Sequence, residues 1–182
     1  RTVMKNKRLV LAEGHFIQED IYGDSAVTAP IPYMEEERKD FDPKRDSFFR
    51  DKLMEAYLFK KNNYFKGIAG SNEWGGKEFE YCISEYGEDD HEHLTFSNVF
   101  INGNYSLFVK TMVPSLKDRD IVMVCNENAS FENLPFSIKK DFRVGSNCMI
   151  NNYGLIDEMK EYISDNDIKD HVFLFSAATL SN

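Results

Sequence analysis

The stretch that decides the fold is RDIVMVCNENAS, residues 119–130. It holds five consecutive apolar residues, from Ile121 to Cys125, between an aspartate and an asparagine. A short apolar run with polar ends predicts a strand that is buried on both faces. The run HVFLFSA, residues 171–177, has the same pattern. Strands of this kind are typical of parallel sheets covered by helices.

Helical patterns separate the apolar runs along the chain. Strands alternating with helices predict βαβ units, so we expect an α/β fold: a doubly wound, mostly parallel sheet with helices on both faces. We expect one domain over residues 1–182. Because a strand and a small polar loop end the sequence, we also expect this domain to continue beyond residue 182. Helices are predicted over 45–63, 77–87, 104–116, 134–142 and 154–167, and further strands over 8–14, 64–70 and 143–147.

The composition is that of a globular protein with an acidic balance. Hydrophobic residues make up 42% of the chain, and the formal net charge is −9. That charge disfavours a protein that binds nucleic acid through its phosphates. Three cysteines without a CxxC spacing favour reduced thiols in a cytoplasmic protein. No apolar run approaches the length of a membrane span, and no signal peptide pattern is present.

Polar residues follow the predicted strands, and ligands of open parallel sheets bind beyond the carboxyl ends of strands. Glu13 and His15 follow the first strand, and alternate residues of an extended segment point the same way, toward one ion or proton. They are our candidates for catalysis and for metal binding. The alternative is that Glu13 caps a helix and His15 is a partly exposed helix residue. The alternative for the polar residues after the strands is ordinary turn chemistry, because loops in any protein are rich in Gly, Ser and Asn. We favour a binding crevice, and the candidates for substrate binding are Gly14, Gly70, Ser71, Asn98, Asn102, Asn104, Tyr105, Asn126, Ser176 and Thr179.

Two phosphate-binding motifs are absent from the sequence, GxGxxG after the first strand and GxxxxGK[ST] anywhere. A phosphate would therefore be held by helix N-termini, by amides, by a metal or by single cations. Asn102 or Asn104 is expected to cap the helix over 104–116. The candidate cations for binding a phosphate are Lys66, Lys139, Lys140 and Arg143. The alternative for each of them is an ordinary surface charge.

The order of segments resembles the GT-D type glycosyltransferases, a bacterial family. Its first strand ends in an Asp-Gly-Glu turn, which Glu13-Gly14-His15 matches here. Its later segments are similar to LMEAYLFKKNNYFKGIAG (53–70), TFSNVFINGNYSLFVKTMVPSL (95–116), IVMVCNENAS (121–130) with Leu134-Pro135 after it, and VFLFSAATLSN (172–182). The similarity spans nearly the whole chain in short, degenerate pieces.

The resemblance implies a Rossmann-like fold and transfer of a sugar from a nucleotide-diphosphate sugar to a glycan or another hydroxyl acceptor. It also implies a divalent metal, Mn²⁺ or Mg²⁺, at the acidic turn, with Glu13 in place of the family's aspartate and His15 in place of its glutamate. Imidazole is a poorer ligand for Mg²⁺ than for Mn²⁺, so this departure puts the metal dependence in question. The alternative hypothesis is a non-catalytic Rossmann-like module that binds a ligand or partner with an eroded metal site. A transferase acting on nucleic-acid bases is the third hypothesis, which the net charge disfavours.

Overall fold

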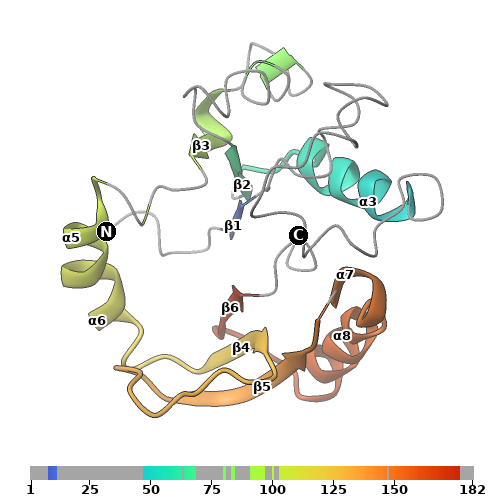
Figure 1. Cartoon of the computed structure of the whole chain (residues 1–182). Coiled ribbons are helices and arrows are strands. Elements are labelled where there is room, and N and C mark those ends of the chain that lie inside the picture. The colour runs from blue at the N-terminus through green and yellow to red at the C-terminus, as the bar shows by residue number, and fades with distance from the viewer. Residues whose placement is uncertain are drawn as a thin grey trace. The chain divides into compact units, whose positions relative to one another are not determined.

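The computed structural model of the chain describes residues 8–11, 47–62, 64–68, 80, 83–84, 91–96, 100, 103–146 and 148–176. These residues fall into two compact units, one within residues 1–99 and one within residues 100–181. Each unit contains a three-stranded parallel sheet (Figure 1). The predicted α/β class with parallel strands is therefore confirmed. That both units form one doubly wound domain stays a prediction.

The first unit is built on the sheet β1-β2-β3, in which all pairs are parallel. Tyr57 of α3 is almost fully buried, whereas the neighbouring Leu58 is exposed. Phe59, which follows this helix, meets Tyr64 edge to face with ring centroids 5.1 Å apart. The helix predicted over 45–63 is confirmed in its central part. The elements of this unit are β1 (Arg8–Leu11), α3 (Ser47–Leu58), β2 (Tyr64–Ile68), the 3-10 helix η4 (His91–His93) and β3 (Leu94–Phe96).

Lys66, in the middle of β2, is fully buried. Its ammonium donates a hydrogen bond to the carbonyl of Phe59 and lies 5.1 Å from the centroid of the Tyr64 ring. The interpretation of Lys66 as a surface charge is therefore wrong. Its strand lies between β1 and β3, which explains the burial.

The second unit is built on the sheet β5-β4-β6, with β4 in the centre and both of its neighbours parallel to it. The strand predicted from RDIVMVCNENAS is this central strand, and the strand predicted over 171–177 is β6. Both strands are confirmed. The predicted burial holds for β4, whereas β6 is only partly buried and its last two residues, Phe175 and Ser176, are exposed. The elements are α5 (Tyr105–Leu107), the π-helical η5 (Phe108–Met112), α6 (Val113–Ser115), β4 (Ile121–Asn126), β5 (Ile138–Val144), α7 (Cys148–Asn151), α8 (Leu155–Asp165) and β6 (Val172–Ser176).

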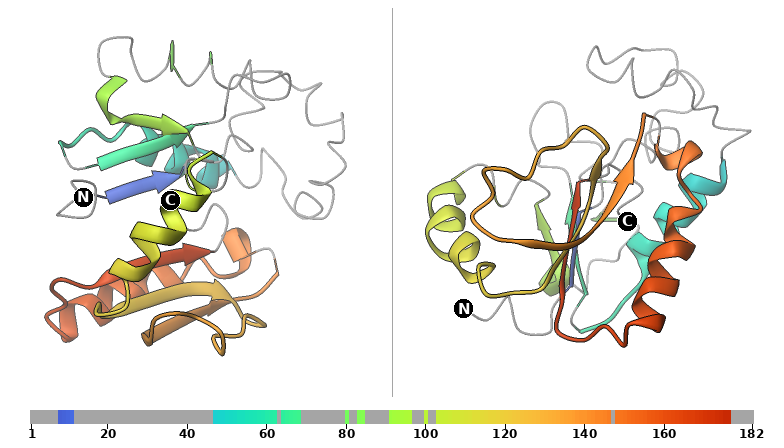
Figure 2. Two further views of the ribbon diagram at one scale, coloured as in Figure 1. Left: turned by 90° about the vertical axis from the view of Figure 1, so that its left-hand side faces the viewer. Right: turned by 90° about the horizontal axis from the view of Figure 1, so that it is seen from below.

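Helix α8 covers one face of this sheet (Figure 2). The apolar stripe that the sequence places on this helix includes Leu155 and Met159, and both are buried in the core. Since alternate residues of a strand point to the same face, Val122 and Val124 reach this core together. Phe142 of β5 meets Tyr162 of α8 edge to face, with centroids 5.7 Å apart. The rest of the buried cluster is Val144 and Cys148.

The helix predicted over 134–142 is wrong. The short strand predicted over 143–147 is right only for residues 143 and 144, because the strand begins at Ile138 and ends at Val144. Residues 138–144 form the strand β5, which pairs with β4 from Ile138 to Val144 with one register shift that leaves Lys139 without a partner in β4. Phe142 and Val144 are both buried, with Arg143 only partly buried between them, the alternation of a strand. Because Ile138 and Phe142 are four residues apart, the sequence also fits one face of a helix. The pairing with the edge of β4 decides in favour of the strand.

Candidate functional site

Three strand ends meet at the carboxyl edge of the second unit's sheet. Asn126 ends β4 and pairs in register with Val144 at the end of β5. On the other side of β4, Cys125 pairs with Ser176, the last residue of β6. Two predicted candidates, Asn126 and Ser176, therefore lie on neighbouring strands at one edge. Both are exposed, so they are accessible to a ligand at that edge.

The chain leaves β4 in a tight turn. The backbone N–H of Glu127 donates to the carbonyl of Val144 over 2.9 Å, so the turn stays attached to β5. The Asn126 side chain accepts a hydrogen bond from the backbone N–H of Asn128 through Oδ1, also over 2.9 Å. The Asn126 carbonyl accepts the N–H of Ala129 over 3.0 Å. This turn fixes the backbone that carries the polar side chains of the edge.

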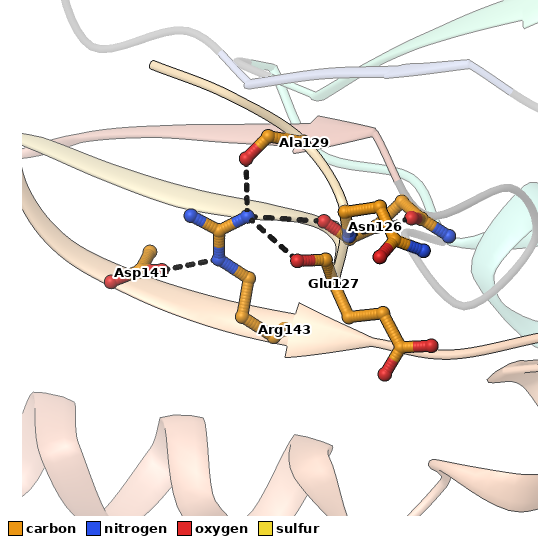
Figure 3. Close-up of polar contacts among 6 residues, drawn as sticks. Asn126, Glu127, Ala129, Asp141 and Arg143 are labelled. Carbon is orange, nitrogen blue, oxygen red and sulfur yellow. Dashed lines mark hydrogen bonds and ion pairs between the residues drawn. The ribbon is translucent and has the colours of Figure 1, made fainter. Parts of the chain in front are cut away.

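Arg143 holds the same turn from the side of β5 (Figure 3). Its Nη1 donates to the carbonyls of Ala129 over 2.7 Å, Asn126 over 3.2 Å and Glu127 over 3.4 Å. The guanidinium carbon lies 4.3 Å from the centroid of the Phe131 ring. A planar guanidinium suits this arrangement because it offers several donors in a fixed geometry.

Asp141 completes the fixation of Arg143. Its carboxylate accepts a hydrogen bond from Arg143 Nε and forms an ion pair with the guanidinium. The same contact raises the pKa of Arg143 above its ordinary value. Because its guanidinium already binds Asp141 and three backbone carbonyls, Arg143 is a poor candidate for binding a diphosphate. It holds the turn after β4 instead. The sequence does not reveal this role. Arg143 stands between the apolar residues Phe142 and Val144, but that position does not show which groups its guanidinium contacts.

Gly145, the first residue after β5, lies next to the side chain of Glu127. A Cβ on Gly145 would lie 3.7 Å from Oε1 of Glu127, ordinary van der Waals contact. The N–H of Gly145 donates to Asn152 Oδ1 over 3.2 Å, and Asn151 Nδ2 donates to the carbonyl of Ser146 over 3.1 Å. Side chains of α7 and of the turn after it thus hold the exit of β5, as the turn at Asn126 holds the exit of β4.

The two cysteines in the described residues, Cys125 and Cys148, are buried. Cys125 is on β4, and its burial raises the pKa of its thiol, an effect that the nearby Arg143 partly offsets. Cys148 belongs to the core between α7 and the sheet. The sequence predicts reduced thiols for the three cysteines. The third of them, Cys82, lies outside the described residues.

The opposite, amino edge of this sheet holds a charge cluster that does not belong to the site. Lys139 Nζ donates to Asp120 Oδ2 over 2.7 Å, and His171 Nε2 lies 3.6 Å from the same oxygen. The pKa of the Asp120 carboxyl is below its ordinary value, chiefly because of the hydrogen bond from Lys139. Lys140 is exposed and lies 4.9 Å from the centroid of the Phe142 ring. Lys139 and Lys140 are therefore surface charges, as one interpretation of the sequence had them.

Asn104 and Tyr105 lie at the start of α5, and both are exposed. Asn104 occupies the predicted cap position, but its side chain makes no capping hydrogen bond. Its backbone carbonyl accepts the N–H of Phe108 over 2.8 Å. Among the residues that the structure describes, no hydrogen bond links these two candidates to the strand ends. The other candidates lie outside the described residues: Glu13, Gly14, His15, Gly70, Ser71, Asn98, Asn102 and Thr179.

No group of three or more potential metal ligands occurs within the described ranges. The expected metal ligands, Glu13 and His15, lie outside them. One carboxylate and one imidazole form a donor set that fits Mn²⁺ better than Mg²⁺. None of the helices in the described part of the chain has the length and apolarity to cross a bilayer.

Comparison of the chain with models of known families, with curated proteins and with solved structures gives no significant match. The class that the fold and the candidate site define is a parallel α/β protein with polar side chains at the carboxyl edge of a three-stranded sheet.

Proposed function

We propose that the chain is a glycosyltransferase, which moves a sugar from a nucleotide-diphosphate sugar to a glycan or another hydroxyl acceptor. The observation that carries the proposal is the carboxyl edge of β5-β4-β6, where Asn126, Glu127 and Ser176 end or follow neighbouring parallel strands. In open α/β sheets, nucleotides and other phosphorylated ligands bind at such an edge. We further propose that the parallel sheets belong to a Rossmann-like, doubly wound fold in a cytoplasmic protein.

Glu13 and His15 are the proposed catalytic residues. They follow β1 in the sequence by two and four residues. In the reaction, the acceptor oxygen forms a bond to the anomeric carbon, and the bond from that carbon to the phosphate oxygen breaks. The proton of the acceptor hydroxyl passes to a base, for which the Glu13 carboxylate and the His15 imidazole are the candidates.

Departure of the diphosphate leaves negative charge that must be stabilised. Mn²⁺ bound by Glu13 and His15 would supply positive charge at that point. The backbone N–H groups of Glu127, Asn128, Ala129 and Gly145 already donate within the chain. Hydrogen bonds to the phosphates would therefore come from side chains at the same edge, such as those of Asn126 and Ser176. The residues that we propose for contacts to the donor are Gly14, Gly70, Ser71, Asn98, Asn102, Asn104, Tyr105, Asn126, Ser176 and Thr179.

The test has a binding part and a turnover part. We expect UDP or GDP to raise the melting temperature of the chain, and to do so more strongly with Mn²⁺ than without it. In the turnover assay, Glu13→Gln is expected to abolish release of the nucleotide diphosphate from the donor. Glu19→Gln, the same change of charge on the same segment, is the control and is expected to retain activity. The proposal fails if no nucleoside diphosphate shifts the melting temperature under any metal condition.

A non-catalytic binding module is the second candidate. Two observations favour it: the turn reads Glu13-Gly14-His15 instead of Asp-Gly-Glu, and Arg143 is engaged with Asp141 and with the backbone. Such a module would bind the nucleotide without turnover. Hydrolysis or transfer of the donor above the rate without protein excludes this second candidate.

A further inference from the structure

Glu127 is the first residue after β4, the central strand of the sheet, and its backbone is held on two sides. Its N–H donates to the carbonyl of Val144 over 2.9 Å. Its carbonyl accepts a hydrogen bond from Arg143 Nη1 over 3.4 Å. The base of this side chain is therefore fixed relative to both β4 and β5. Residues that act on a ligand are most effective when the backbone beneath them is held in this way.

The carboxylate of Glu127 is directed away from the guanidinium of Arg143 (Figure 3). It lies beside Gly145, where an added Cβ would be 3.7 Å from Oε1. Among the described residues, it takes part in no hydrogen bond and no ion pair, although Arg143 contacts the carbonyl of the same residue. Arg143 pairs with Asp141 instead. An exposed carboxylate beside an engaged arginine has its acceptor oxygens available for a ligand.

The neighbouring side chain supplies the complementary group. Asn126 Oδ1 accepts the N–H of Asn128, which places the amide at the same turn with its NH2 group as a further donor. A side chain at position 145 would contact the Glu127 carboxylate, so a glycine there leaves that side of the carboxylate without a side-chain neighbour from this position. A carboxylate acceptor next to an amide donor matches the hydroxyl groups of a sugar, each of which donates and accepts. A divalent cation would need more oxygen ligands than this one carboxylate offers.

We propose that Glu127 binds hydroxyl groups of the donor's sugar, and so determines which sugar is accepted. This inference rests on the proposed glycosyltransferase function and deepens it. Asn126 assists through its amide, and Arg143 positions both residues through the backbone. In the sequence, Glu127 is one of several polar residues that follow β4. Its place beside Gly145 and its orientation away from Arg143 distinguish it from the others.

The test compares the affinities for a nucleotide with and without its sugar. Dissociation constants are measured by titration calorimetry in the presence of Mn²⁺ for UDP-glucose against UDP, and for GDP-mannose against GDP. Glu127→Gln, which keeps the shape and removes the charge, is expected to weaken binding of the nucleotide sugar by about tenfold, since hydrogen bonds to charged groups are the stronger ones. Binding of the free nucleotide should change by less than about twofold, because the proposal gives Glu127 contacts to the sugar and none to the nucleotide.

The matched control is Glu132→Gln, the same change at an exposed glutamate of the same loop. It should leave all four dissociation constants unchanged. If the wild-type chain binds neither nucleotide nor nucleotide sugar, the proposed function and this inference both fail. If it binds the nucleotide sugar and Glu127→Gln binds it equally well, or if the sugar adds no affinity, the inference on Glu127 fails while the nucleotide site stands.

Discussion

Phe142 is the side chain whose removal should most clearly damage the second unit. It is only 6% exposed, meets Tyr162 of α8 edge to face and belongs to the core between helix and sheet. Replacing such a residue by alanine costs about 3 to 5 kcal/mol, because the apolar contacts are lost and a cavity remains. We expect a loss of that size in the free energy of unfolding for Phe142→Ala.

The measurement is urea unfolding of the full chain, followed by circular dichroism. Because an entire domain is often stable by only about 5 to 15 kcal/mol, Phe142→Leu provides a milder variant, with an expected loss of about 1 to 2 kcal/mol. Phe175→Ala is the matched control, since Phe175 of the edge strand β6 is 42% exposed. Its expected cost is about 1 kcal/mol. Equal losses for Phe142→Ala and Phe175→Ala would refute the packing of β5 against α8.

Two further predictions concern the charged contacts of the same sheet. The native pKa of Asp120 is depressed chiefly by the hydrogen bond from Lys139, so the stabilisation from this pair is present above the unfolded pKa of about 4 and is lost as the pH falls through the native pKa. Lys139→Met should raise the pKa of Asp120 in a carboxyl NMR titration, and an unchanged pKa would contradict the assigned cause. Arg143→Lys keeps the charge but loses the planar set of donors, so amide hydrogen exchange should accelerate at residues 127–131 and not in α8. Unchanged exchange at those residues would show that Arg143 does not hold the turn.

Hydrophobic patterning was sufficient to predict the central strand, because a buried strand needs apolar residues on both faces. The run from Ile121 to Cys125 has them, and it forms β4. The helix predicted over 154–167 contains α8, in which Leu155 and Met159 lie four residues apart on one face and are both buried. For such elements the local pattern and the tertiary environment agree.

The strand β5 was missed because its sequence does not decide between two structures. Lys139 and Lys140 are exposed, as is common on edge strands, and they interrupt the apolar alternation. Ile138 and Phe142 fit one side of a helix as well as they fit a strand. The neighbouring strand β4 selects the extended form through its hydrogen bonds, and no local pattern contains that information.

The candidate site was predictable to the extent that it follows from topology. Parallel strands bring their carboxyl ends to one edge, and this rule placed Asn126 and Ser176 on neighbouring strands. The orientation of single side chains does not follow from it. It depends on the turn after β4. In that turn Arg143 contacts the carbonyl of Glu127, while the carboxylate of Glu127 lies beside Gly145.

The central claim is that a nucleotide sugar binds at the carboxyl edge of the sheet β5-β4-β6. The most direct measurement is a titration of the ¹⁵N-labelled chain with UDP-glucose, and separately with GDP-mannose, followed through its backbone amide NMR signals. Mg²⁺ replaces Mn²⁺ in this experiment because Mn²⁺ is paramagnetic and broadens NMR signals. We predict that the largest shift changes within this sheet occur at residues 126–128, at Gly145 and at Ser176. Changes confined to the amino edge, around Asp120 and His171, or no change at saturating UDP-glucose or GDP-mannose, would contradict the account.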